Sequence, residues 1–146
     1  MTDVASLLQG KPHHLWSISP TETVYSAIQL MDAKGIGALL VMHDGVLNGI
    51  LSERDYARKV VLMGRSSRET QVKEIMTRQV YYTYPGQNTE ECLVVMTEHH
   101  LRHLPVMQEE RVIGMISMGD VVKDIIKEQQ DRIAQLEHYI SWEESY

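Results

Sequence analysis

Two short stretches of the chain each carry a serine and an aspartate at the same spacing, a combination that can hold polar groups of a ligand. The stretches are GILSERD, residues 49–55, and GMISMGD, residues 114–120. A serine hydroxyl and backbone N–H groups at a helix start suit a phosphate, because the helix dipole places partial positive charge there. An aspartate one turn later can accept hydrogen bonds from two vicinal hydroxyls, as a ribose offers. The pattern therefore predicts a nucleotide site at each motif.

The same residue types also fit a purely structural role. Ser52 or Ser117 could cap a helix with the aspartate in its first turn, and for one isolated motif this interpretation would be preferred. Here the motif occurs twice at a fixed offset, each time after an apolar hairpin pattern. The repetition favours ligand binding over capping alone.

The motifs are part of a duplication that covers most of the chain. A shift of 65 positions aligns residues 20–55 with residues 85–120 without a gap, and eight of the 36 aligned pairs are identical. A repeat of this length indicates a duplicated supersecondary unit.

Apolar spacing predicts the elements that lead to the first motif. Apolar residues at i, i+3, i+4 and i+7 from Val24 predict an amphipathic helix that ends at Gly35. Two apolar runs, residues 38–42 and 46–51, flank Asp44-Gly45 and predict a β-hairpin. The hairpin would deliver the chain directly to the serine of the motif.

A second helix is expected to carry the first motif at its start and to end at Gly64. Its predicted inward-facing residues are Tyr56, Val60 and Leu62 or Met63. A polar linker follows, and a short helical stub precedes each copy, VASLL at residues 4–8 and VKEIM at residues 72–76.

The second copy is expected to match the first element by element. The predicted elements are a helix over 88–99 with Cys92, Leu93 and Met96 inward, strands over 104–107 and 111–116, and a helix from about Gly119. Before them, Tyr81, Tyr82 and Tyr84 lie in a predicted strand, where alternation places them on both faces and core packing is favoured over base stacking. Cys92, the single cysteine, is interpreted as a small buried hydrophobe and not as a nucleophile.

Composition limits the classes of function. A formal net charge of −6 argues against a nucleic-acid partner, because such binding needs a basic face. No apolar run approaches the roughly 20 residues of a membrane span, and the amino terminus lacks the pattern of a secretory signal. We therefore expect a cytoplasmic protein with neither a nucleic acid nor a membrane as partner.

The last predicted helix is longer than its counterpart in the first copy. Ile126, Ile133 and Ile140 are spaced by seven, with Leu136 between the last two, as along one edge of a coiled coil. Other positions of the edge are polar, so the pattern is a weak one. Two interpretations stay open, packing on the chain's own domain and packing on a second subunit.

The duplicated strand-helix-strand-strand-helix unit with these two motifs resembles a tandem pair of cystathionine-β-synthase (CBS) domains, a Bateman module, of the stand-alone bacterial type. Family positions are also matched by GALLVM at residues 37–42, IMT at residues 75–77 and RHLPV at residues 102–106. The resemblance implies an α/β (α+β) fold with two pseudo-twofold-related β-α-β-β-α CBS units and a C-terminal helical extension.

The resemblance implies ligand sensing, such as energy sensing, in place of catalysis. Modules of this family bind adenosine compounds in clefts between the two sheets. We expect AMP first, then ADP, ATP, NAD(H) or S-adenosylmethionine, and no required cofactor. A homodimer and a regulated protein of unknown identity are further implications. The alternative function is a structural scaffold dimer with vestigial nucleotide sites.

The resemblance also assigns roles to residues. Asp55 and Asp120 would hold ribose hydroxyls, and Ser52 and Ser117 would hold the phosphate. The remaining nucleotide-binding candidates are Ile36, Gly37, Ala38, Gly49, Arg54, Arg102, His103, Leu104, Pro105, Gly114 and Met115.

The two predicted sites differ. Pro105 matches a proline that the family often has in its base-contacting segment, whereas the first copy has Leu40. The first motif carries Arg54 where the second has Gly119. Because each cleft of the family draws on both copies, we expect the second site to gain Arg54 and to be the tighter one.

Neither catalysis nor metal binding is predicted. A dehydrogenase that contains this module needs a catalytic barrel of about 250 residues, which this chain cannot supply. The sequence holds no Ser-His-Asp set, nucleophile elbow, Walker loop or zinc signature. His99, His100 and His103 do not share a metal-ligand spacing on one element, because the repeat places His99 at a helix end and His103 at a strand.

The sequence predicts four segments. They are a first CBS repeat with its N-terminal helix, 1–64, a linker, 65–71, a second CBS repeat, 72–127, and a C-terminal helical extension, 128–146.

Overall fold

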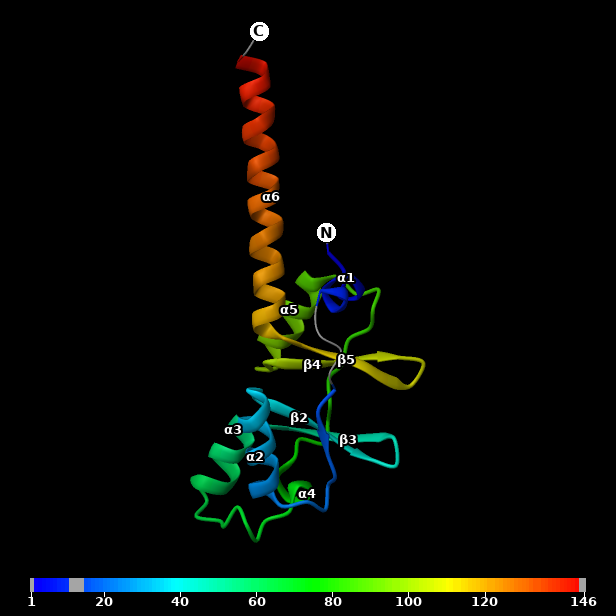
Figure 1. Ribbon diagram of the computed structural model, residues 1–146, viewed down its shortest axis with the longest axis vertical. Helices are drawn as coiled ribbons and strands as arrows, with labels where there is room; N and C mark the ends of the chain where they lie inside the picture. Colours follow the sequence, from blue (N-terminus) through cyan, green and yellow to red (C-terminus); the bar gives the residue numbers. More distant parts are fainter. Residues whose placement is uncertain (1, 11–14, 145–146) are drawn as a thin grey trace. The chain divides into compact units, whose positions relative to one another are not determined.

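The computed structural model describes residues 2–10 and 15–144 and divides into two compact units (Figure 1). Unit 1 contains the described residues of Met1–His13 and Tyr82–Tyr146, and unit 2 contains those of His14–Tyr81. Residues 1 and 11–14 of the predicted first repeat, and 145–146 of the predicted extension, lie outside the described residues.

Unit 2 holds the first motif on a three-stranded sheet in the order β1-β2-β3, in which β1 runs parallel and β3 antiparallel to β2. Its elements are β1 (Ser17–Ile18), α2 (Val24–Lys34), β2 (Ala38–His43), β3 (Val46–Ser52), α3 (Glu53–Tyr56), the π-helix η1 (Ala57–Val61) and α4 (Val72–Ile75). A core cluster joins α2, the sheet, η1 and α4 through Val24, Met31, Leu39, Val41, Leu51, Val60, Val72 and Ile75.

Local sequence explains where the elements of unit 2 begin and end. Thr23 caps α2 because its hydroxyl accepts a hydrogen bond from the Ser26 N–H at 3.1 Å. Gly35 ends this helix in the left-handed region, at φ 63°. Asp44 and Gly45, at φ 48° and 76°, form the tight turn between β2 and β3. The predicted helix and hairpin are confirmed.

The helix that carries the first motif differs from the prediction. It is α-helical only over α3 and then becomes the π-helix η1, in which the Leu62 N–H donates to the Ala57 carbonyl at 3.0 Å. A π turn contains one residue more than an α turn, so the residues after it face a different side. Val60 is buried, but Leu62 and Met63 are 77% and 70% exposed. The prediction that one of these two faces inward is therefore wrong.

Unit 1 repeats this plan around the second motif, with a two-stranded antiparallel sheet. Its elements are α1 (Val4–Gln9), α5 (Thr89–Glu98), β4 (His103–Gln108), β5 (Arg111–Ser117) and α6 (Met118–Glu144). Asn88 caps α5 by accepting a hydrogen bond from the Glu91 N–H at 2.8 Å. As predicted, Cys92 and Met96 of α5 are buried.

The tyrosine segment, residues 81–84, does not form the predicted strand. Only an isolated parallel bridge joins Thr83 to Val106. Thr83 points inward and is fully buried, so alternation turns its two neighbours outward, and Tyr82 and Tyr84 are 62% and 51% exposed. The predicted alternation between the two faces is therefore seen, whereas the core packing favoured for the tyrosines is not seen at Tyr82 and Tyr84.

Each helical stub packs on a different repeat from the one that follows it in the chain. In unit 1, the Val4 N–H of α1 donates to the Gln87 carbonyl at 2.9 Å. In unit 2, Thr77, just after α4, forms an antiparallel bridge with Ile50 of β3. Unit 1 therefore takes its stub from residues before the first repeat, and unit 2 takes its stub from the residues that precede the second.

Helix α6 begins inside unit 1 and continues beyond it. Its first turns lie against α5, β5 and α1 (Figure 1), and Thr89 of α5 donates its hydroxyl to Asp124 at 3.1 Å. From Gln129 to Trp142 every side chain is exposed. Among residues 2–10 and 15–144, no helix combines the length and hydropathy that crossing a membrane requires.

Candidate functional site

The first motif lies where β3 ends and α3 begins, and its two polar residues bond to each other. The Asp55 N–H donates to Ser52 Oγ at 3.2 Å, and the Ser52 N–H donates to Asp55 Oδ2 at 3.0 Å. The Ser52 hydroxyl donates to the same carboxylate oxygen at 3.1 Å. This reciprocal pair is a capping box, which satisfies donors at the helix start.

The second motif has the same geometry at the junction of β5 and α6. The Asp120 N–H donates to Ser117 Oγ at 3.1 Å, and the Ser117 N–H donates to Asp120 Oδ2 at 2.8 Å. Both serines and both aspartates are partly buried. The repeated motif thus encodes one local structure, formed once in each unit.

Each motif is joined to the start of the hairpin's first strand by a further matched hydrogen bond. The residue after the serine donates its N–H to a carbonyl 16 residues earlier, Glu53 to Gly37 at 3.0 Å and Met118 to Arg102 at 2.8 Å. In the sheet register Ser52 pairs with Ala38. The structure therefore brings the predicted phosphate and ribose residues next to the predicted base-framing segment within each unit.

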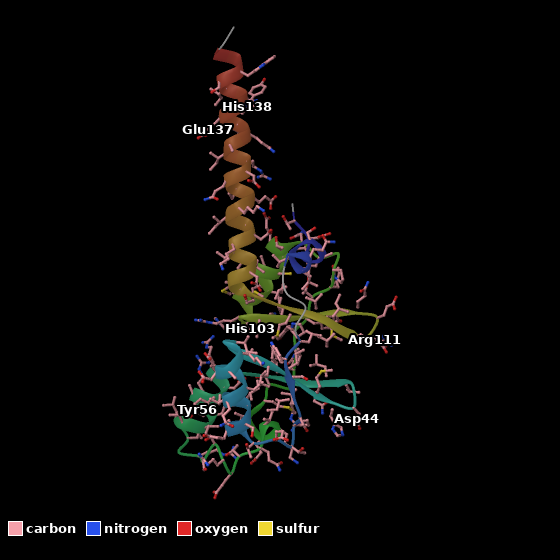
Figure 2. All side chains as sticks on the ribbon, in the orientation of Figure 1. Asp44, Tyr56, His103, Arg111, Glu137 and His138 are labelled. Carbon is pink, nitrogen blue, oxygen red and sulfur yellow. The ribbon has the colours of Figure 1, made fainter. Side chains whose placement is uncertain are left out.

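The predicted base-framing residues of unit 1 occupy the first half of β4. His103 pairs with Ser117, Leu104 with Ile116 and Pro105 with Met115. His103 and Met115 are half-buried, whereas Leu104 and Pro105 are buried. His103 is labelled in Figure 2, at the start of its strand.

The motif glycines have a packing role. A Cβ on Gly49 would lie 2.6 Å from the Thr77 carbonyl oxygen, and one on Gly114 would lie 2.7 Å from Leu8 Cδ2. Each glycine thus lets a helical stub approach the sheet closely. Their place in the nucleotide site stays a prediction.

One N–H group remains available at each helix start. Among the described residues, the N–H groups of Arg54 and Gly119, which lie between serine and aspartate, have no hydrogen-bond acceptor. Both residues are exposed. An exposed N–H at the positive end of a helix is a donor suited to an anionic oxygen.

The two motifs differ in the groups around their aspartates. Asp55 Oδ1 accepts a hydrogen bond from the Thr77 hydroxyl at 3.3 Å and lies 3.1 Å from Lys59 Nζ. The position that matches Lys59 in the second copy is Asp124, which bonds to Thr89. A cation in the first copy is therefore replaced by an anion in the second.

Sequence reasoning missed Lys59 and Thr77 as neighbours of the first motif. The signal for Lys59 was the reversal of charge between positions 59 and 124 of the aligned copies. Thr77 lies in the IMT segment, but nothing in its spacing indicated a contact 22 residues back along the chain.

The histidines lie as predicted, His99 at the C-terminal end of α5 and His103 in β4. Within the described ranges, no three residues among His, Cys, Asp and Glu form a group that could hold a metal ion.

The chain belongs to the CBS domain family, whose model matches residues 12–62 and 72–127. It is similar to the mitochondrial CBS domain-containing protein CBSX3 of Arabidopsis thaliana, with 37% identity over 131 residues. The match covers 86% of this chain and 63% of that protein, so the chain spans less than two thirds of this relative's length.

Solved structures of CBS-domain pair proteins share the fold. A protein with CBS domains from Burkholderia ambifaria MC40-6 is 51% identical, with a TM-score of 0.85 over 88% of this chain and 96% of that chain. The CBS-domain protein ATU1752 from Agrobacterium tumefaciens is 35% identical, with a TM-score of 0.81 over 84% and 98%. The predicted family and fold class are confirmed, and these relatives indicate no enzyme family.

Proposed function

We propose that this chain is a non-catalytic regulatory module that binds an adenosine nucleotide at its two Ser-x-x-Asp motifs. The observation that carries the proposal is the formation of the same helix start twice, with the serine, the aspartate and one exposed N–H in the same arrangement each time. A capping role alone would not require both copies to retain this set.

The roles follow the chemistry of each group. The aspartates accept hydrogen bonds from ribose hydroxyls, and the serine hydroxyl with the N–H of Arg54 or Gly119 faces the phosphate. The base lies along the segments Ile36 to Ala38 and Arg102 to Pro105. Because Asp55 and Asp120 already bond to their own serines, a ligand uses their remaining lone pairs or displaces the serine.

AMP is the first candidate ligand, followed by the other adenosine compounds. A CBS domain pair was solved in complex with 5′-methylthioadenosine and S-adenosyl-L-methionine. At 20% identity it shares the fold with this chain, and the ligands are those of that protein. For this chain the proposal rests on its own motifs.

Titration of the full chain with AMP by isothermal calorimetry tests the proposal. We expect saturable binding, weaker binding of GMP, and a loss of roughly 1 to 3 kcal/mol in the Asp120→Ala variant, the scale of a hydrogen bond to a charged group. Asn88→Ala is the matched control, because it removes a helix cap from the same unit without touching the motif. Circular dichroism confirms that each variant is folded.

The alternative is a scaffold in which the motifs only cap helices. It is favoured by one observation, that in both motifs the serine and the aspartate accept hydrogen bonds from each other's backbone N–H groups. No heat from AMP or from any other adenosine nucleotide, or unchanged binding in the Asp55→Ala, Asp120→Ala double variant, would select this alternative. A turnover assay with ATP and AMP tests the non-catalytic part of the proposal, which predicts no product.

We further propose that the protein is a cytoplasmic homodimer that reports ligand occupancy to a partner protein. The exposed apolar residues of α6 support the dimer, because such a stripe is a liability on a soluble monomer. Light scattering at micromolar concentration should give twice the chain mass of 16.8 kDa. The chain mass itself, with and without nucleotide, would contradict the dimer.

A further inference from the structure

The exposed part of α6 carries an apolar seam. The seam consists of residues spaced alternately by four and three, Val122, Ile126, Gln129, Ile133, Leu136 and Ile140. All three isoleucines and the leucine are more than half exposed. The sequence left two interpretations open, packing of this edge on the chain's own domain and packing on a second subunit. Because these side chains are exposed, they do not pack on the described part of their own domain.

A helix segment with this exposure needs a partner. Figure 2 shows Glu137 and His138 on the part of α6 that extends past the other elements of unit 1. An isolated helix of about 14 residues is only marginally stable in water, since most helix stability in proteins comes from packing an amphipathic face. The exposed part of α6 is of this length, from Gln129 to Trp142.

We propose that the seam pairs with the same seam of a second copy of this chain, in parallel and in register, as a two-stranded coiled coil. The alternate spacing of four and three is that of a heptad's a and d positions. The a positions are isoleucines, and the d positions of the exposed part are Gln129 and Leu136. Isoleucine at a with leucine at d is the combination that favours two strands in parallel coiled coils.

Gln129 decides the direction. In a parallel pair in register, the two Gln129 side chains face each other, and each amide can donate to and accept from the other. The antiparallel alignment that buries the rest of the seam places each Gln129 opposite an Ile133. Two amides would then be buried without partners, at a cost of about 1 to 3 kcal/mol each.

Charges beside the seam fit the parallel pair. Arg132 occupies a g position and Glu137 the following e position, so in a parallel pair each Arg132 lies next to Glu137 of the other copy. Within one chain, Arg132 lies 3.8 Å from Glu128 and is 63% exposed, so it can reach either carboxylate. In the antiparallel alignment, Arg132 of one copy would face Arg132 of the other, which is unfavourable. The same alignment would place Lys123 of one copy next to Glu137 of the other, which is favourable.

This pairing deepens the homodimer part of the proposed function and does not depend on nucleotide binding. A dimer held only by other helices would have the dimer mass without contact between the two seams. The experiment therefore reads the seam contact directly.

Cysteine cross-linking in the full chain tests the pairing. Gln129→Cys should form a disulfide-linked dimer under mild oxidation, because the two introduced thiols face each other. Asp131→Cys is the matched control, since Asp131 lies on the same exposed turn but at an outward f position. The parent protein controls for the native Cys92, which is buried.

We expect a high yield for Gln129→Cys and little for Asp131→Cys on a non-reducing gel. Equal yields, or no cross-link for Gln129→Cys in a sample that light scattering shows to be dimeric, would overturn the pairing and leave the dimer standing. A mixture of Gln129→Cys and Ile133→Cys chains that cross-links mainly between the two variants would overturn the parallel direction. A monomeric parent protein would overturn both the seam pairing and the homodimer.

Discussion

The ammonium of Lys59 lies 3.1 Å from Asp55 Oδ1 and also donates a hydrogen bond to the Ile75 carbonyl at 2.9 Å. One lysine therefore connects the first motif to α4. In the second copy the matching residue is Asp124, which is bonded to α5 through Thr89. The two copies share a helix start. One turn after the aspartate, the first copy has a lysine that contacts α4, and the second copy has an aspartate that contacts α5.

Replacing Lys59 with Met should lower the free energy of unfolding by about 1 kcal/mol. The lysine is 45% exposed, so solvent weakens its ion pair, and the hydrogen bond to the Ile75 carbonyl adds a modest amount. Urea denaturation measures the change. Lys73→Met, at an exposed position of α4, is the control and should alter stability by less than half as much.

The Ser117/Asp120 motif should bind the nucleotide more tightly than the Ser52/Asp55 motif. The second copy has Pro105 in its base-framing segment, where the first copy has Leu40, and at the first motif a ribose must compete with the Lys59 ammonium for Asp55 Oδ1. In a calorimetric titration, Asp120→Ala should abolish the high-affinity phase, and Asp55→Ala should affect the weaker phase. Equal losses, or removal of the tight phase by Asp55→Ala alone, would contradict this order.

Alanine at Gly49 should destabilise the protein more than alanine at Gly114. At Gly49 the new methyl group would press on the Thr77 backbone oxygen, which cannot move without its β-bridge. At Gly114 it would meet the end of the flexible Leu8 side chain. We expect losses of about 3 and 1 kcal/mol, measured by urea denaturation.

A compensating change provides the control for this comparison. Leu8→Ala should recover part of the loss in the Gly114→Ala chain, because it makes room at the methyl group. No single side-chain truncation should recover Gly49→Ala. Similar losses for the two glycines would show that the stubs do not restrict them differently.

Cys92 should make stability depend on pH in the alkaline range. Burial raises the pKa of its thiol, the Thr83 hydrogen bond lowers it, and the charge of Glu91 raises it further. The unfolded thiol loses its proton near pH 8.5, whereas the folded thiol keeps it to higher pH. The free energy of unfolding should therefore fall as the pH rises above about 8.5.

The comparison with Cys92→Ala isolates this effect from other groups that titrate at high pH. The difference in unfolding free energy between the parent and this variant, from urea denaturation, should be constant below pH 8 and should shrink above it. A difference that stays constant to pH 10 would show that the thiol is not protected.

Much of the fold and the geometry of the motifs could be predicted from the sequence, because they depend on local spacing. The 65-residue offset located both hairpins, and the serine-aspartate spacing located both helix starts. The side that Leu62 and Met63 face could not be predicted, because a π turn interrupts the helical period without a mark in the sequence. The contact between Lys59 and the Ile75 carbonyl could not be predicted either, because it depends on where α4 packs.

The assignment of the stubs has a consequence for how the protein folds as it is synthesised. Unit 2 is one continuous stretch, so all of its contacts can form once its residues have left the ribosome. Unit 1 is discontinuous, and α1 must wait for Gln87 and Gly114, which are made more than 80 residues later. Closing so long a loop is slow and costs entropy. A nascent chain should therefore complete unit 2 first, with α1 unpaired until the second repeat has emerged.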